Sequence, residues 1–285
     1  MRRLENRVAV VTGAGSGIGR ATSLELAQAG CELALVHLKP EPLAETAAAI
    51  ARLGRRATEH VVDVSDKAQM LGLVERVTRE HGAVHVLVNN AGVSVAASFE
   101  EHSIEDFEWL IGINFWGVVY GCKFFLPVLR KADEAHIVNI SSVFGFVGMP
   151  LNSSYCASKF AVRGFSEALR AELTGSPIGV TSVHPGGVAT NIVRDARFQE
   201  RGFEGLHAST VRRFKHMLPP EAAARSIVRG IKQNAARVLI TRDAYLIDIF
   251  KRLFPVLMSE LIGRRWRTEV EKQLAAAPQF RGLEP

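Results

Sequence analysis

Short runs of consecutive apolar residues, many of them β-branched, alternate along the chain with longer stretches rich in Ala, Leu, Glu and Arg. Strands buried on both faces have this uninterrupted apolar pattern, and parallel strands need helical connections between them. The pattern therefore predicts one doubly wound α/β domain with a mostly parallel sheet. The predicted strands lie at residues 8–11, 33–36, 61–62, 84–88, 137–140 and 180–183.

A glycine-rich turn follows the first predicted strand and opens a helical pattern. It reads Thr12-Gly13-Ala14-Gly15-Ser16-Gly17-Ile18-Gly19. Glycines let the backbone approach a pyrophosphate closely, and the N–H groups of the helix that follows offset its charge. Alone, such a turn would equally suit a simple tight turn, but its place between a strand and a helix indicates a nucleotide site.

Further motifs follow the later strands in a fixed order. They are Asp63-Val64, Asn89-Asn90-Ala91-Gly92, Asn114, Ser142, Tyr155-x-x-x-Lys159, Pro185-Gly186 and Thr190. Together with the glycine turn, they make residues 4–242 resemble the short-chain dehydrogenase/reductase superfamily. The resemblance implies a Rossmann-type domain with a seven-stranded sheet over residues 1–242, followed by a helical C-terminal extension, residues 243–285.

The resemblance also implies the residues that bind a nicotinamide dinucleotide, with Asp63 and Val64 near the adenine. The expected cofactor contacts are Gly13, Ser16, Gly17, Ile18, Gly19, His37, Lys39, Asp63, Val64, Asn90, Ala91, Gly92, Tyr155, Lys159, Pro185, Gly186, Val188 and Thr190.

Tyr155 and Lys159 are four residues apart and therefore share one face of a predicted helix. A free phenol has a pKa of about 10, which must fall by roughly two to three units before Tyr155 can accept a proton near pH 7. The Lys159 ammonium and an oxidised nicotinamide are the cations that would lower this pKa.

The resemblance makes Tyr155 the general acid/base and Ser142 the donor to the substrate oxygen. It assigns Lys159 to the nicotinamide ribose as well, and Asn114 to a water-mediated proton relay. Taken singly, these residues have ordinary explanations as helix positions, a turn serine and a buried amide.

The end of the second predicted strand bears on the choice of cofactor. NAD binders of this family carry an acidic residue there, but this chain has His37, followed by Leu38 and Lys39. The missing carboxylate favours NADP(H) because nothing repels a 2′-phosphate. Ser16 stands where many NADP-preferring relatives have a basic residue, so NAD(H) remains the alternative.

Residues 191–218 form an Arg-rich segment with interspersed apolar residues and are predicted to be a substrate lid loop. A mobile solvated loop is the competing interpretation. In the extension, Leu246, Ile249, Phe250, Leu253, Leu257 and Leu261 have helical spacing, and Pro255 should interrupt the helix. This stripe is expected to cover the substrate cleft or a subunit interface, with peripheral membrane contact as the weaker alternative.

Composition limits the other partners and the location. Lys+Arg 35 against Asp+Glu 29 gives a net charge of +6, and no nucleic-acid-binding motif is present, so no nucleic acid is expected. Three cysteines without a C-x-x-C pair favour a reducing compartment, the cytoplasm. No ligand spacing for a metal is found, and no run reaches the roughly 20 consecutive apolar residues of a membrane span.

The sequence therefore predicts an oxidoreductase that transfers hydride between NADP(H) and a lipophilic alcohol, ketone or aldehyde. The family leads us to expect a homodimer or homotetramer. The alternative is a dinucleotide-binding redox sensor or scaffold without turnover. Sensors tend to lose the tyrosine or lysine, and this chain keeps both.

Overall fold

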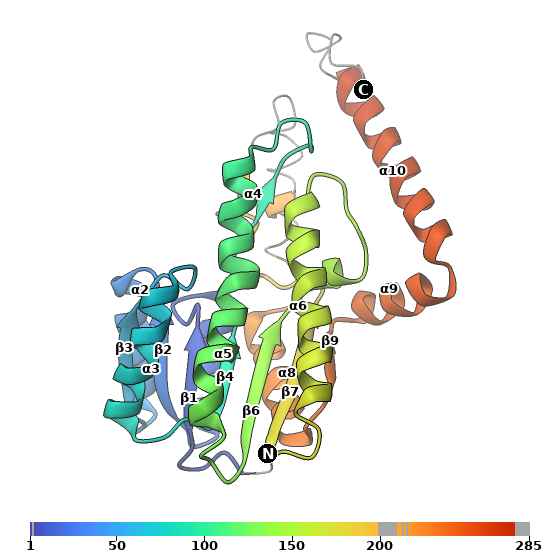
Figure 1. Cartoon of the computed structure of the whole chain (residues 1–285). Coiled ribbons are helices and arrows are strands. Elements are labelled where there is room, and N and C mark those ends of the chain that lie inside the picture. The colour runs from blue at the N-terminus through green and yellow to red at the C-terminus, as the bar shows by residue number, and fades with distance from the viewer. Residues whose placement is uncertain (2, 199–209, 213, 215, 277–285) are drawn as a thin grey trace.

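The computed structural model describes residue 1 and residues 3–198, 210–212, 214 and 216–276. The main strands are β1 (Val8–Thr12), β2 (Glu32–His37), β3 (Ala57–Val61), β4 (Val86–Asn89), β6 (Ala135–Ile140), β7 (Ile178–Pro185) and β9 (Arg237–Ile240). Within the described residues they form one seven-stranded sheet in the order β3-β2-β1-β4-β6-β7-β9 (Figure 1). Every neighbouring pair is parallel, which confirms the predicted doubly wound architecture.

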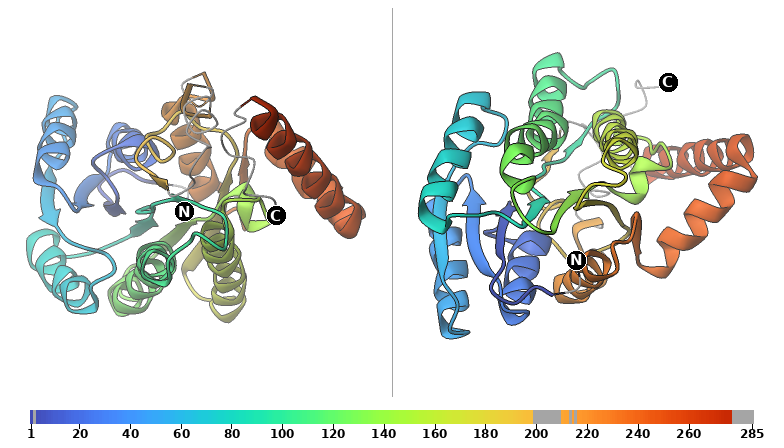
Figure 2. Two further views of the ribbon diagram at one scale, coloured as in Figure 1. Left: turned by 90° about the horizontal axis from the view of Figure 1, so that it is seen from above. Right: turned by 60° about the horizontal axis from the view of Figure 1, so that its bottom comes forward.

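Helices cover both faces of this sheet (Figure 2). One face carries α1 (Gly17–Gln28), α2 (Pro40–Arg52) and α8 (Pro220–Gln233), whereas the other carries α3 (Lys67–His81), α5 (Gly117–Leu129) and α6 (Ser153–Glu172). Successive residues of a strand point to opposite faces. In β1, Ala9 and Val11 join the first core layer and Val10 joins the second, so an unbroken apolar run is needed.

Local signals set the ends of α3. The Asp66 carboxylate accepts hydrogen bonds from the backbone N–H groups of Ala68 and Gln69, at 2.8 and 3.0 Å, which caps the start of the helix. Gly82 ends it with φ +76°, a left-handed conformation that glycine adopts without strain.

One long helical segment runs through α4 (Ile104–Ile111), a π-helical turn η1 (Gly112–Trp116) and α5. By length and composition, residues Ile104–Leu129 are apolar enough to cross a membrane. Val118, Cys122, Phe125 and Leu129 are buried against the sheet, however, as expected for a core helix. The π turn contains Asn114, and such turns are frequent at functional sites.

The first part of the predicted lid loop is pinned to the domain by a second, two-stranded sheet. Here β5 (Val95–Ala96) pairs in parallel with β8 (Arg197–Phe198). Arg197 also forms an ion pair with Asp106 of α4 and lies over the Trp109 ring, 3.5 Å from its centroid. The rest of the predicted lid includes residues 199–209, 213 and 215, which lie outside the described residues.

The C-terminal extension consists of α9 (Arg242–Leu253) and α10 (Pro255–Ala276), with the break at Pro255 that the proline predicts. Helix α10 projects away from the sheet and its covering helices (Figure 1). Leu246, Ile249 and Leu253 are more than half exposed, so the apolar stripe of α9 faces solvent in the single chain.

Candidate active site

The carboxyl ends of β1 and β4 lie side by side at the point where strand order reverses, the usual ligand crevice of a doubly wound sheet. The Thr12 hydroxyl accepts from the backbone N–H groups of Asn90 and Ala91 at 2.9 and 3.0 Å. The Asn90 amide donates to the Thr12 carbonyl at 2.9 Å. The Asn90 side chain therefore ties β4 to the glycine turn.

The glycine turn has the geometry of a pyrophosphate cradle. Gly13 and Gly17 have positive φ, +67° and +51°. A Cβ on Gly19 would lie 2.2 Å from the Gly13 carbonyl oxygen, so no other residue fits there. Ser16 precedes α1 without a side-chain cap, which leaves backbone N–H groups at the helix start for an anion. These residues fit the dinucleotide that the sequence implies.

His37 ends β2 beside the glycine turn. A Cβ on Gly15 would lie 2.7 Å from the His37 ring, which places the imidazole against the turn. Burial and the neighbouring Lys39 ammonium lower the pKa of His37, so the ring is neutral at pH 7. The end of β2 therefore carries a neutral imidazole, His37, and a lysine, Lys39, two residues later in the chain.

The other expected contacts near the adenine end differ in what their side chains do. The Asp63 carboxylate accepts from the Ser65 hydroxyl and backbone N–H at 2.7 and 2.9 Å. The Val64 side chain is buried, and a Cβ on Gly117 would touch it at 2.9 Å. Val64 therefore packs α5 onto the sheet.

The loop after β7 closes the opposite side of the crevice. Thr190 lies close to Gly17, since a Cβ there would be 3.2 Å from the Thr190 methyl group. Val188 is buried and bridges to Leu218, while Gly186 donates its backbone N–H to the Ile240 carbonyl at 3.0 Å. This loop thus connects the glycine turn to β9.

Ser142, Tyr155 and Lys159 converge at the end of β6, as predicted. The Ser142 hydroxyl hydrogen-bonds the Tyr155 phenol, and the Lys159 ammonium lies 5.5 Å from the centre of the Tyr155 ring. The ammonium donates to the Ile140 carbonyl at 3.0 Å and is almost fully buried. The Ser141 hydroxyl donates to the Lys159 carbonyl at 2.7 Å. This bond joins the segment after β6, which carries Ser142, to α6.

Burial dominates the acidities of this pair. It raises the pKa of Tyr155 to about 12, with the Ser142 hydrogen bond acting in the opposite direction, and lowers the pKa of Lys159 to about 8. The tyrosine shift is opposite in direction to the one expected from the sequence. The reason is that removing the phenolate from water outweighs the hydrogen bond that favours it.

Asn114 is fully buried beside Lys159. Its amide donates to the Val93 carbonyl at 2.9 Å and to the Ser158 hydroxyl at 3.2 Å, and its oxygen accepts from the Val93 N–H at 2.8 Å. A Cβ on Gly92 would lie 3.2 Å from the Asn114 oxygen and 3.5 Å from the Lys159 nitrogen. The side chain thus joins η1 to the loop after β4, next to the ammonium.

Apolar side chains surround the tyrosine. Val93, Trp109 and Tyr155 pack against a small cluster made by Val95, Ala97 and Leu110. The Phe144 ring meets Tyr155 edge-on, with centroids 6.0 Å apart. A substrate oxygen that hydrogen-bonds Ser142 and Tyr155 would therefore lie next to these apolar side chains.

The chain matches a known protein family over the part that holds this site. The profile of the short chain dehydrogenase family matches residues 7–201, more than half of the chain, and the matched part contains the glycine turn, Ser142, Tyr155 and Lys159. The chain is a short chain dehydrogenase. It is accordingly an oxidoreductase, and its sheet is the one that this family shares.

Similar dehydrogenases cover nearly the whole chain. A Mycobacterium tuberculosis protein named as the oxidoreductase SadH is 39% identical over 92% of this chain and 96% of its own length. Cyclohexanol dehydrogenase of an Acinetobacter species is 31% identical, over 86% of this chain and 95% of its own. A Burkholderia phymatum short chain dehydrogenase solved in complex with NAD superposes with a TM-score of 0.84 at 29% identity, covering 90% of this chain and 97% of that one.

Sequence reasoning missed two features of this dehydrogenase. The clamp of Arg197 on Asp106 and Trp109 joins residues about 90 positions apart, and no local pattern announces it. His184 precedes Pro185 and is fully buried behind Ser142. The available signal for it was a histidine directly before Pro185, at the carboxyl end of a predicted strand.

Proposed function

We propose that this short chain dehydrogenase interconverts a lipophilic secondary alcohol and its ketone, with NADP(H) preferred over NAD(H). The convergence of Ser142, Tyr155 and Lys159 beside the glycine turn is the observation that carries the proposal. The apolar surround of Tyr155 and the similarity to cyclohexanol dehydrogenase support the substrate class.

In the reducing direction, each of these residues has a distinct role. A bound nicotinamide supplies the hydride to the substrate carbon. The Tyr155 hydroxyl donates its proton to the carbonyl oxygen, and the Ser142 hydroxyl hydrogen-bonds that same oxygen as negative charge develops on it. The Lys159 ammonium offsets the charge left on the tyrosine oxygen. Because burial keeps Tyr155 protonated at neutral pH, it is ready to act as an acid.

The first test is titration of the protein with NADPH and NADH, followed by reduction assays on cyclic and linear ketones of increasing size. We expect tighter NADPH binding and a kcat/KM that rises with apolar size, because the added surface leaves water. Alcohol oxidation should speed up as the pH rises from 7 toward 8, since Tyr155 must then lose its proton, and should slow again at higher pH as Lys159 loses its charge. Cofactor binding without turnover on any substrate would favour the sensor alternative.

The cofactor preference is tested by His37→Asp. A carboxylate at this position would accept from a ribose 2′-hydroxyl and repel a 2′-phosphate. We expect the ratio of kcat/KM for NADPH to that for NADH to fall by roughly 10- to 100-fold. His37→Asn, which has the same shape as the aspartate but carries no charge, is the control and should leave the ratio close to that of the natural protein. An unchanged ratio in His37→Asp would mean that this position does not face the ribose.

A further inference from the structure

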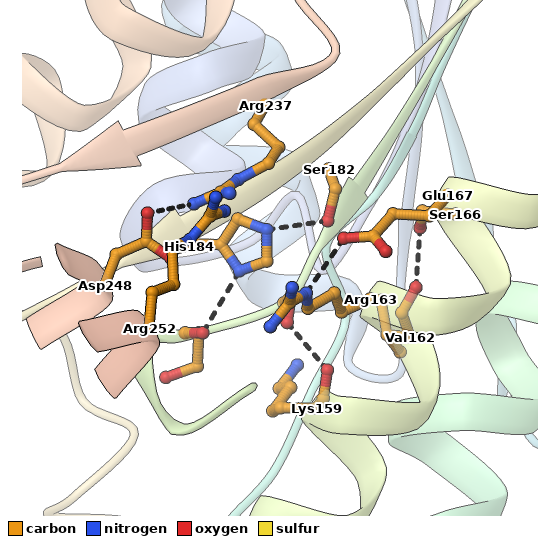
Figure 3. Close-up of polar contacts among 12 residues, drawn as sticks. Lys159, Val162, Arg163, Ser166, Glu167, Ser182, His184, Arg237, Asp248 and Arg252 are labelled. Atoms are coloured by element: carbon orange, nitrogen blue, oxygen red, sulfur yellow. Dashed lines mark hydrogen bonds and ion pairs between the residues drawn. The ribbon is translucent and has the colours of Figure 1, made fainter. Parts of the chain in front are cut away.

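His184 lies on β7 with its ring beside Ser182 and close to Arg163 and Arg237 (Figure 3). It also contacts the backbone of Ser142, the proposed catalytic serine. Its side chain has no exposed surface, and its ring packs on Phe146 with centroids 4.3 Å apart. The Nδ1 atom is 3.2 Å from the Ser142 carbonyl oxygen, and the Nε2 atom is 2.9 Å from the Ser182 hydroxyl. Both ring nitrogens are therefore engaged.

These two contacts define one tautomer. A carbonyl oxygen only accepts hydrogen bonds, so the Nδ1 atom must carry the proton that Ser142 receives. The Nε2 atom of a neutral ring then has a lone pair, and the Ser182 hydroxyl donates to it. The Ser142 carbonyl thus selects the Nδ1–H tautomer, and the Ser182 hydroxyl supplies the donor that the remaining ring nitrogen needs.

The surroundings keep this ring neutral. The Arg163 and Arg237 guanidinium groups lie over the Phe146 ring, 4.8 and 5.0 Å from its centroid. Asp248 of α9 accepts from Arg237 at 2.8 Å and from Arg252 at 3.1 Å, which neutralises part of that charge. Burial, partly offset by the hydrogen bond to Ser142, lowers the pKa of His184 to about 3. His184 is therefore uncharged at neutral pH.

The Ser142 backbone needs such support because it stands where the sheet ends. Ser141 makes the last sheet bond of this strand end, from its N–H to the Val183 carbonyl at 2.8 Å. The next residue turns into the short 3-10 helix η2 (Val143–Gly145), with the Ser142 hydroxyl accepting from the Phe144 N–H at 3.1 Å. Within this turn the Ser142 carbonyl also accepts from the Gly145 N–H at 2.9 Å, and the bond from His184 ties the turn to the neighbouring strand β7.

We propose that His184 is a positioning residue that orients Ser142 through a hydrogen bond from its Nδ1–H to the Ser142 carbonyl, with the Ser182 hydroxyl donating to its Nε2 atom. The proposal rests on the proposed role of Ser142 at the substrate oxygen. Its consequence is that a residue which never meets substrate controls the alignment of the serine hydroxyl.

A pair of variants of equal shape tests it. His184→Asn keeps an N–H donor near the Nδ1 position, whereas His184→Leu has the same branching and no donor. We expect kcat to fall roughly 10- to 100-fold in His184→Leu and only about threefold in His184→Asn, because a small misplacement of a catalytic group is costly. The Kd of NADPH should stay within about twofold in both variants.

His136→Leu is the matched control. His136 is also fully buried in the sheet, and its Nε2 atom contacts the Thr181 hydroxyl at 2.7 Å, but it lies at the opposite end of β6 from Ser142. This variant should lose stability without losing kcat. Equal losses of kcat in His184→Asn and His184→Leu, or a comparable loss in His136→Leu, would overturn the proposal.

A measurement on the unmodified protein is independent of turnover. The ¹⁵N shifts of the His184 ring should show a protonated Nδ1 and an unprotonated Nε2, unchanged between pH 5.5 and 8.5. An Nε2–H tautomer would refute the positioning bond whatever the enzyme does. A Ser142→Ala variant with full activity would instead refute the proposed function while leaving the tautomer result standing.

Discussion

Replacing Tyr155 with Phe should lower kcat by roughly 10²- to 10⁴-fold and leave the Kd of NADPH within about twofold. The substitution removes one hydroxyl, which hydrogen-bonds Ser142 and is the proposed proton donor. The ring contacts with Phe144 and the Val95 cluster are retained, so the fold should persist. Stopped-flow reduction of a ketone, with the Kd from NADPH fluorescence, measures both quantities.

Tyr120→Phe is the control for that experiment. Tyr120 of α5 stacks between Trp116 and Phe124, with centroids 5.7 Å apart in each pair. It should keep kcat within about twofold, since no reacting group is touched. If Tyr155→Phe retained a similar activity, the proton would have to come from another group, and the assignment of Tyr155 would be wrong.

Lys159→Met should abolish most turnover and at the same time make the protein more stable at pH 7. Burial lowers the pKa of Lys159 from 10.5 to about 8, so the folded protein carries a buried ammonium at neutral pH. A shift of this size corresponds to about 3 kcal/mol of destabilisation, of which roughly 1 kcal/mol is offset by the bond to the Ile140 carbonyl. We expect the free energy of unfolding to rise by roughly 2 kcal/mol and kcat to fall by roughly 100-fold.

The pH dependence of that gain has a definite sign. Between pH 8 and 10.5, the unfolded lysine binds a proton that the folded lysine has released. The stability of the natural protein therefore rises with pH in this window, and the advantage of Lys159→Met shrinks toward zero. Urea unfolding at pH 7, 9 and 10.5 measures it. Lys123→Met, at an exposed position of α5, should show no such trend, and a constant advantage for Lys159→Met would contradict the burial argument.

The sheet and the main motifs could be predicted because their signals are local. An unbroken apolar run predicts a strand that is buried on both faces of a sheet. The glycines at positions of positive φ, Gly13 and Gly17, are recognised by their place between a strand pattern and a helix pattern. Even the interruption at Pro255 follows from one residue. Each of these features depends on residues that are close together in the sequence, so the sequence alone is enough to predict it.

What could not be predicted depends on burial and on distant partners. The raised pKa of Tyr155 follows from desolvation in the folded protein, whereas the sequence displays only the cation four residues away. Asn114 has a helical pattern, yet it lies in a π turn, and its amide donates to Val93 and Ser158, 21 and 44 positions away. The bond from His184 to Ser142 spans 42 positions, far beyond any periodic pattern.

The packing of α8 on α1 has a consequence for synthesis of the protein. The two helices are about 190 residues apart in sequence, and Leu26 and Ala27 of α1 share one core layer with Ile227, Val228 and Ile231 of α8. During translation, the apolar side of α1 must wait for almost the entire chain to leave the ribosome before its native cover exists. The glycine turn, which is among the first parts to be made, is thus among the last to gain its final support.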